Sequence, residues 1–316
     1  MDLKQLEYII KIAEENNITR AAEKLYITQS ALNQQLLRLE RELGTPLFYR
    51  SRTNWHPTEA GQVYVESAKK ILQIKHETYS IISDIAATKK GSLSVGLTPG
   101  RGIDMFTAVY PAFHQQYPDI TVEPREMSVR SQQHEIAQGR LDIGFMTLRE
   151  SDRTGDVYQV IGREEFVLAI PEGHPLGAMA APAGEPLAVM DLARLKYEPF
   201  VFMYRESTSR RLTDAVFKEA GFAPSVLFET SSTATIANLV RSRICCGLIP
   251  LYYVRRQPEG IASFAPDRHP AWDIAVSWRQ GGYVSQAARE FIRLAAEYWT
   301  NTPESRWRSP SSRRCP

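Results

Sequence analysis

Apolar residues repeat at intervals of three and four through the N-terminal part of the chain, which is the spacing of amphipathic helices. The first apolar face consists of Leu3, Leu6, Ile10 and Ala13. Thr19 is expected to cap a second helix over residues 20–25, and Thr28 a third that ends at Gly44. These two helices are too close for anything but a turn between them. The pattern therefore predicts a helix-turn-helix over residues 19–43.

The chain then changes to short extended pieces around a polar turn, over residues 46–57. Thr58 opens a long helix to about Thr88. Its apolar stripe, which one helix cannot bury alone, consists of Val63, Ala68, Ile71, Tyr79, Ile82 and Ile85. Such a helix usually packs against a second copy of itself, and residues 89–91 are expected to form the linker that follows.

From residue 92 onward, runs of strand-forming residues alternate with helical segments, which is typical of α/β architecture with a parallel sheet. Strands are expected over residues 93–97, 120–124, 141–145, 165–170, 199–203, 226–229, 247–250 and 272–278, with a closing helix over 285–298. The pattern restarts after the third strand, so it predicts two similar α/β lobes. Residues 301–316 are rich in Ser, Pro and Arg and are expected to be disordered.

The face of the third helix that points away from its leucine stripe carries side chains that suit the major groove of DNA. They are Ser30, Gln34, Arg38, Arg41 and, on the flank, Asn33. Gln and Asn can bond adenine bidentately, and Arg can bond guanine or phosphate. A solvated face is the alternative, but its place in a tightly turned helix pair favours DNA. Arg50 and Arg52 follow in a loop with no acidic neighbour in sequence, as a wing on the DNA backbone or minor groove requires.

The composition of the chain excludes some classes of protein and site but does not indicate a function. The net charge of +2 supports nucleic-acid binding only weakly, and no apolar run reaches the roughly 20 residues that span a bilayer. With no secretion signal at the start, we expect a cytoplasmic chain with no membrane partner. Cys245 and Cys246 are expected to be a reduced core pair and Cys315 a tail residue, and neither the cysteines nor the histidines have the spacing of a metal site.

These residues closely resemble the winged helix-turn-helix of LysR-type transcriptional regulators. The resemblance rests on Thr19-Arg20-Ala21-Ala22-Glu23-Lys24-Leu25, Thr28-Gln29-Ser30-Ala31-Leu32, Leu39-Glu40-Arg41-Glu42-Leu43-Gly44, Leu47-Phe48-Tyr49-Arg50 and Thr58-Glu59-Ala60-Gly61. It continues more weakly through Gly139-Arg140-Leu141-Asp142, His174-Pro175-Leu176 and Leu248-Ile249-Pro250. It covers about residues 1 to 300.

The resemblance implies an α/β fold class with a winged helix-turn-helix, a long linker helix and a two-lobed effector domain of the periplasmic-binding-protein type. The expected DNA-binding domain spans residues 1–61, the linker and dimerisation helix with its hinge 58–90, and the effector domain 91–300. Lobe I is expected at residues 91–162 and 270–300, and lobe II at 163–269.

Partners and DNA-facing residues are also implied by the resemblance. Such proteins are usually homotetramers built from dimers that bind double-stranded promoter DNA and respond to a small-molecule effector, and RNA polymerase is a further candidate partner. The DNA-facing positions carry over to Thr28, Gln29, Ser30, Asn33, Gln34 and Arg38, with Arg50 and Arg52 in the wing.

An effector site is expected where strands of the two lobes end, because ligands of open α/β sheets bind there beside helix N-termini. The residues at these ends are Thr98, Pro99, Gly100, Arg101, Gly102, Ser128, Arg130, Thr147, Tyr204, Arg205, Ser207, Ser231 and Thr233. Their hydroxyls and arginines suggest a small anion such as a carboxylate, and no cofactor is expected. Helix capping by the serines and a surface position for Arg101 remain open alternatives.

Two other classes of protein fit less well. A periplasmic solute-binding protein would share the two lobes but would not need the helix-turn-helix. An enzyme would need a nucleophile elbow, a phosphate-binding loop or a metal cluster, none of which the sequence contains. Glu164 and Glu165 are expected to be a surface run and Asp142 a turn residue, so we predict no enzymatic activity.

Overall fold

The computed structural model describes residues 2–51, 55–182 and 185–301. They form two compact units, one made mostly of the residues up to Gly91 and one beginning at Ser92.

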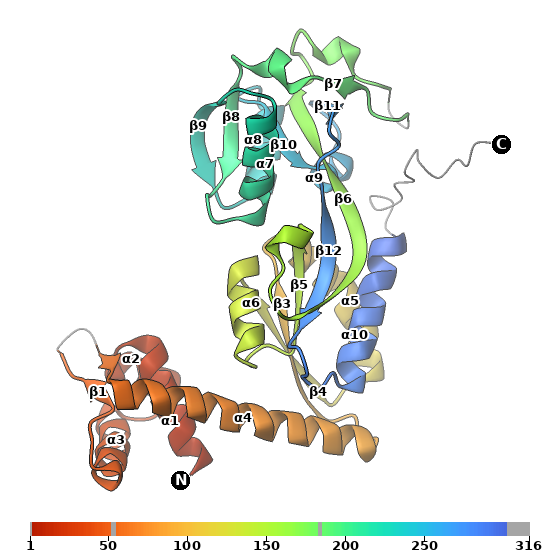
Figure 1. The fold of residues 1–316 in the computed structure, drawn as a ribbon. Coiled ribbons are helices and arrows are strands. Elements are labelled where there is room, and N and C mark those ends of the chain that lie inside the picture. Colours follow the sequence, from red (N-terminus) through yellow and green to blue (C-terminus); the bar gives the residue numbers. More distant parts are fainter. Residues whose placement is uncertain (1, 52–54, 183–184, 302–316) are drawn as a thin grey trace. The chain divides into compact units, whose positions relative to one another are not determined.

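The first unit contains four helices and a short hairpin (Figure 1). Its elements are α1 (Leu3–Glu15), α2 (Ile18–Lys24), α3 (Gln29–Leu43), β1 (Phe48–Tyr49), β2 (His56–Pro57) and α4 (Glu59–Ile85). The strands β1 and β2 pair antiparallel, with Phe48 opposite Pro57. The predicted extended pieces are thus a small β-hairpin that directly follows the helix pair.

Local capping explains where these helices begin. The side chain of Asn17 accepts from the backbone N–H groups of Thr19 and Arg20, so Asn17 caps α2 and the expected cap at Thr19 is wrong. Thr28 caps α3 as predicted, accepting from Ala31 N at 3.2 Å. Gly44 ends α3 in the left-handed conformation, with φ of +71°.

The leucine stripe of α3 builds the core of the first unit. Leu32, Leu36 and Leu39 are buried against Ile9 and Ile12 of α1 and against neighbouring residues of α2 and the hairpin. The predicted fourth member, Leu43, is instead 45% exposed, so the buried stripe ends one turn before the helix does. Burial of one face leaves the opposite face of α3 in solvent.

Lobe I of the second unit is a sheet with the strand order β4-β3-β5-β12-β6. Its elements are β3 (Gly91–Leu97), α5 (Arg101–Gln116), β4 (Ile120–Glu126), α6 (Val129–Ala137), β5 (Ile143–Leu148), β12 (Ala271–Trp278) and α10 (Gln286–Asn301). The helices α5 and α10 pack on the sheet through Phe113, Phe145 and Phe291.

Lobe II continues from the far half of β6 (Val157–Pro171), on which β10 and β11 pair antiparallel. Its other elements are β7 (Val189–Met190), β8 (Pro199–Met203), α7 (Thr208–Glu219), β9 (Ser225–Thr230), α8 (Thr233–Arg241), β10 (Gly247–Pro250), α9 (Leu251–Arg256) and β11 (Ile261–Pro266). The short turns of 3-10 helix lie at Glu150–Asp152, Gly177–Met179 and Leu192–Leu195. The single strand β6 therefore belongs to both lobes (Figure 1).

The sheet is mixed rather than parallel throughout. The pairs β3–β5 and β8–β9 are parallel as expected, but β12 runs antiparallel to both β5 and β6. The structure also contains β7, β11 and α9, which the pattern did not predict. Within the described ranges, no helix is both long and apolar enough to cross a membrane.

Candidate functional site

The first candidate site is the exposed face of α3. Thr28, Gln29, Ser30, Gln34 and Arg38 are exposed, and Asn33 is half-buried. They lie at the start and on the first three turns, and Ser30, Gln34 and Arg38 point away from the buried leucines. Amides, hydroxyls and one guanidinium are therefore presented together on a protruding helix, which suits hydrogen bonding to base edges in a major groove.

The wing is the second part of this surface. Its Arg50 is paired with a buried acid. The guanidinium of Arg50, at the end of β1, pairs with the carboxylate of Glu40 on α3 and lies 5.7 Å from the ring centroid of Trp55. The sequence neighbours of Arg50 gave no sign of this acid, because Glu40 is ten residues away and comes close only when the hairpin folds back. Arg52 lies outside the described residues.

A residue that the pattern missed lies beside the start of α3. Tyr26 in the turn is 95% exposed and has a left-handed φ of +55°. Its backbone N–H still donates to Glu23 O at 3.1 Å. The turn thus projects an aromatic side chain next to the N-cap of α3, and only the position of Tyr26 in a two-residue turn could have indicated this.

The second candidate site is a cavity of about 760 Å³ between the two lobes. Ten of the expected effector residues line it: Thr98, Pro99, Gly100, Arg101, Ser128, Thr147, Tyr204, Ser207, Ser231 and Thr233. Three do not: Gly102 packs closely against β3, Arg130 is exposed, and Arg205 points elsewhere. The wall is rich in hydroxyl groups from both lobes.

Two helix N-termini face this cavity. The side chains of Ser207 and Ser232 cap α7 and α8, accepting from the third backbone N–H of each helix, those of Arg210 at 3.0 Å and Thr235 at 3.3 Å. Among the described residues, no acceptor bonds the first two N–H groups of either helix, which belong to cavity-lining residues: Thr208, Ser209, Thr233 and Ala234. Helix capping by the serines and anion binding are thus compatible, since different N–H groups serve each.

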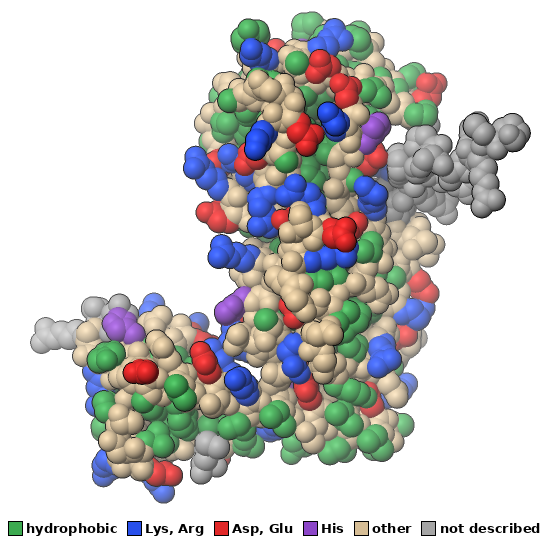
Figure 2. Space-filling model, in the orientation of Figure 1, with side chains coloured by type: hydrophobic (Ala, Val, Ile, Leu, Met, Phe, Trp, Pro, Cys, Tyr) green, Lys and Arg blue, Asp and Glu red, His purple; other side chains and the backbone are tan. Residues whose placement is uncertain are grey.

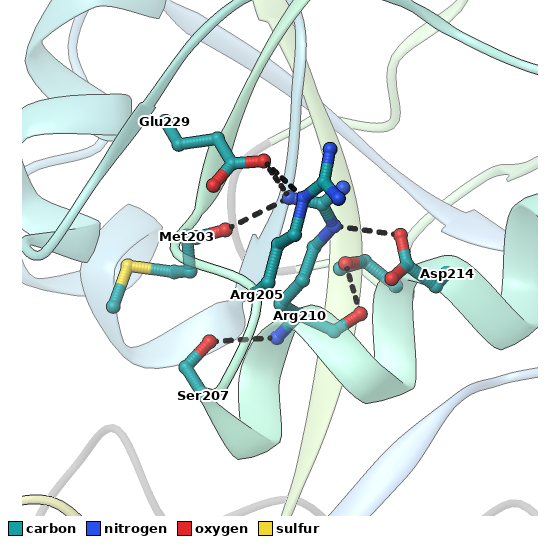
Figure 3. Close-up of polar contacts among 7 residues, drawn as sticks. Met203, Arg205, Ser207, Arg210, Asp214 and Glu229 are labelled. Atoms are coloured by element: carbon teal, nitrogen blue, oxygen red, sulfur yellow. Dashed lines mark hydrogen bonds and ion pairs between the residues drawn. The ribbon is translucent and has the colours of Figure 1, made fainter.

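Arg205 and the neighbouring Arg210 do not line the cavity themselves and belong to a polar cluster beside it (Figure 3). Both guanidinium groups bond Glu229, at 3.4 Å and 2.8 Å, and Arg210 also bonds Asp214 and the carbonyl of Met203. The bonds to these two arginines lower the pKa of Glu229. Since Arg205 is 80% exposed and turned toward Glu229, the structure gives no support to its expected place in the effector site.

Arg101 lines the cavity but is neither exposed nor free. Its guanidinium forms a bidentate pair with Glu164, and it lies over the rings of Tyr252 and Trp299 at 4.7 and 5.0 Å. Glu164 also accepts from Tyr252 N at 3.0 Å and from Trp272 Nε1 at 2.9 Å. The expected surface position of Glu164 is therefore wrong, because four donors compensate the burial of its carboxylate.

The cavity wall also includes residues that the sequence analysis did not name. Tyr253, Arg256 and Gln257 come from α9 and its end, Arg241 from the end of α8, and Asp104 from the first turn of α5. The carboxylate of Asp104 accepts from Tyr252 Oη at 2.8 Å and pairs with Arg256. The rule that ligands bind after strand ends could have found α9, since it directly follows the predicted strand at 247–250.

The two neighbouring cysteines are reduced and buried, as predicted. Burial raises the pKa of Cys245 to about 11 and that of Cys246 to about 12, so both are thiols at neutral pH. Cys315 lies outside the described residues. The described side chains also contain no group of three or more His, Cys, Asp or Glu that could hold a metal ion.

Comparison with known proteins matches both units to one family. Residues 3–62 match the bacterial regulatory helix-turn-helix protein of the lysR family, and residues 86–300 match the LysR substrate binding domain. The chain is 29% identical to the HTH-type transcriptional regulator YwbI of Bacillus subtilis, over 97% of this chain and 100% of that protein. It is 27% identical to YcgK of the same organism, over 94% of each.

Solved structures share the fold. A full-length OxyR variant from Pseudomonas aeruginosa superposes with a TM-score of 0.68 at 22% identity, covering 97% of each chain. Full-length CbnR, solved in a complex with its target DNA, has a TM-score of 0.61 at 22% identity, over 93% of this chain and 99% of that one.

Proposed function

The chain belongs to the LysR family of DNA-binding transcriptional regulators with an effector-binding domain, and we propose that it reads the major groove with the exposed face of α3. Asn33 and Gln34 bond base edges, and Arg38 bonds guanine or phosphate. Thr28, Gln29 and Ser30 lie where the helix enters the groove. Arg50 and Arg52 belong to the wing beside it. The observation that carries this proposal is the exposure of Gln34, Arg38 and the start of α3 beside a capped, tightly turned partner helix.

Fluorescence anisotropy tests the DNA proposal. The full-length chain should bind the intergenic DNA upstream of its own gene more tightly than a scrambled duplex at physiological salt. Gln34→Ala should lower affinity and relax base choice at one position, at a cost of about 1–3 kcal/mol. Arg52→Gln should weaken binding to both duplexes and reduce the salt slope by about one. If both variants behave alike, the division into base and phosphate contacts is wrong.

For the effector domain, we propose that the interlobe cavity binds a small anion such as a carboxylate. The support is the pair of free N–H groups at each of two helix N-termini, together with the surrounding hydroxyls. The charges of Arg101 and Arg256 do not carry the proposal, because Glu164 compensates Arg101 and Asp104 compensates Arg256. The third cavity arginine, Arg241, donates to the backbone carbonyls of Tyr253 and Gln257.

One substitution removes a single proposed donor. Ala234→Pro deletes the second N–H of α8, and proline is tolerated there because that N–H makes no helical bond. Thermal shift of the full-length chain against small carboxylates and inorganic phosphate should identify a stabilising anion. Ala234→Pro should bind it about tenfold more weakly, the value of one hydrogen bond to a charged group. Ala234→Gly keeps the N–H and should bind like the wild type, so equal loss in both variants would refute this placement.

We further propose that α4 pairs with α4 of a second copy. Val63, Ile74, Tyr79, Ile82 and Ile85 are exposed on it, and apolar side chains are visible on the surface of the first unit in Figure 2. Beside them, an apolar groove of about 630 Å³ is lined by residues that include Leu6, Leu43, Leu47, Val63, Tyr64 and Ile71. A homodimer or homotetramer would cover this surface and place two recognition helices on neighbouring half-sites. Sedimentation should show a dimer or tetramer; a monomer at micromolar concentration would contradict the pairing.

A regulator that acts at a promoter also has an expected partner and compartment. RNA polymerase is proposed as a partner there, and the cytoplasm as the compartment in which the chain meets chromosomal DNA. The relatives named above are transcriptional regulators, and we propose that this chain likewise has no catalytic activity.

A further inference from the structure

Glu40 is an acidic residue on the recognition helix that does not face solvent. It lies one turn before the end of α3 and is only 8% exposed. One carboxylate oxygen accepts from the backbone N–H of Leu47 at 2.8 Å, and the other pairs with the guanidinium of Arg50. Both oxygens are therefore used, which explains how the charge is tolerated in a buried position.

The partners of Glu40 all lie on the segment that leads from α3 into the wing. The backbone carbonyl of Glu40 accepts from Gly44 and from Thr45, the latter at 3.2 Å, where the chain turns back at the end of the helix. Its carboxylate then holds Leu47, just before β1, and Arg50, just after it. One residue thus fixes the hairpin to the helix along the whole connection.

Arg50 is held from a second side as well. Its guanidinium lies over the ring of Trp55, whose backbone N–H donates to the carbonyl of Asn16 at 2.9 Å, at the end of α1. Both strands of the hairpin are therefore tied to helices, β1 through Glu40 and the start of β2 through Trp55. The charge of Arg50 is compensated by Glu40, so it is not a free cation for phosphate.

We propose that Glu40 is a positioning residue for DNA recognition, which fixes the wing against the recognition helix, and that Arg50 acts through this ion pair. The inference rests on the winged helix-turn-helix binding DNA. The proposed role of Glu40 and simple electrostatics predict opposite changes in DNA affinity when its carboxylate is removed. Removing a carboxylate from a DNA-binding surface should, by charge alone, strengthen binding to every sequence. Loss of wing position should instead weaken binding to the preferred sequence.

The test compares two substitutions that remove the same charge from the same helix. Glu40→Gln keeps an oxygen to accept from Leu47 but loses the ion pair with Arg50. Glu42→Gln is the matched control, because Glu42 is exposed. The DNA probe is a duplex selected from a random library by the wild-type full-length protein, beside a scrambled duplex of equal composition. Failure to select any duplex would count against DNA recognition itself, and so would be distinct from failure of this inference.

The measured quantity is the ratio of affinities for the selected and scrambled duplexes. We expect Glu40→Gln to reduce this ratio about tenfold relative to Glu42→Gln, comparable to losing one base-reading contact. A ratio within twofold of the Glu42→Gln value would overturn the proposal. If thermal unfolding shows that Glu40→Gln does not fold, Arg50→Gln takes its place, since it leaves the bond from Leu47 to Glu40 intact. It should reduce the ratio about tenfold relative to wild type, and an unchanged ratio would equally overturn the proposal.

Discussion

Replacing Glu164 by glutamine would break a buried ion pair at the interlobe cavity. The carboxylate of Glu164 serves the two guanidinium nitrogens of Arg101, the backbone N–H of Tyr252 and the indole N–H of Trp272. An amide in its place keeps one oxygen, but its NH₂ group faces donors. Arg101, with a side chain only 7% exposed, would then carry a buried charge without a counter-ion.

The magnitude follows from this burial. Removing one partner of a buried pair costs about 3–5 kcal/mol, whereas an exposed pair contributes about 0–1 kcal/mol. For a domain of this size, each kcal/mol shifts the melting temperature by about 2–4 °C, so we expect Glu164→Gln to lower it by roughly 6–20 °C. Arg101→Met should cost somewhat less, because Glu164 would keep two of its donors.

Calorimetry of the full-length protein, with the effector-domain transition followed separately, measures these shifts. The exposed pair of Arg293 and Glu297 on α10 provides the control, and Glu297→Gln should leave the melting temperature nearly unchanged. The double variant Arg101→Met with Glu164→Gln should lose clearly less than the sum of the single losses. Additive single effects, or a loss below about 1 kcal/mol for Glu164→Gln, would refute the buried coupling.

Two further predictions concern lobe II. In a Cys315→Ser background, Cys245 and Cys246 should resist a thiol reagent at about pH 8 until the protein is unfolded, because burial keeps both pKa values at about 11 to 12; rapid labelling of the folded protein would contradict this. Arg243 follows α8 with a left-handed φ of +61°, so Arg243→Gly should stabilise lobe II by about 0.5–1 kcal/mol in urea unfolding. Ser242→Gly, where φ is −76°, should destabilise it by a similar amount, and equal effects would show that φ is not the cause.

The helices of the first unit were predictable from sequence because each buries one regular face and begins at a polar cap. The start of α2 could not be predicted exactly. Asn17 and Thr19 are both good N-cap residues, and only the backbone geometry selects Asn17. In the second unit, β11 was missed because Ile261 and Ala262 are both buried, which removes the alternation that marks a strand.

Site residues at strand ends could be predicted from sequence. Residues whose place depends on an ion pair with a distant residue could not. The rule for open α/β sheets located ten of the 26 residues that line the cavity, without reference to distant contacts. Glu164 and Glu40 were misjudged or passed over for one reason: their partners lie 63 and ten residues away in sequence. Charge alone favours the surface for a glutamate, and only the folded chain brings the compensating donors.

The position of β12 has a consequence for synthesis of the protein. It lies between β5, which ends at Leu148, and β6, yet it begins only at Ala271. Lobe I therefore cannot close its sheet until all of lobe II has left the ribosome. At about 5–20 residues per second, this delay is on the order of ten seconds, during which the edge of β5 is without its neighbour. Lobe II, whose strands all precede β12 in the chain, can fold during this interval, while the edge of β5 is open to other chains.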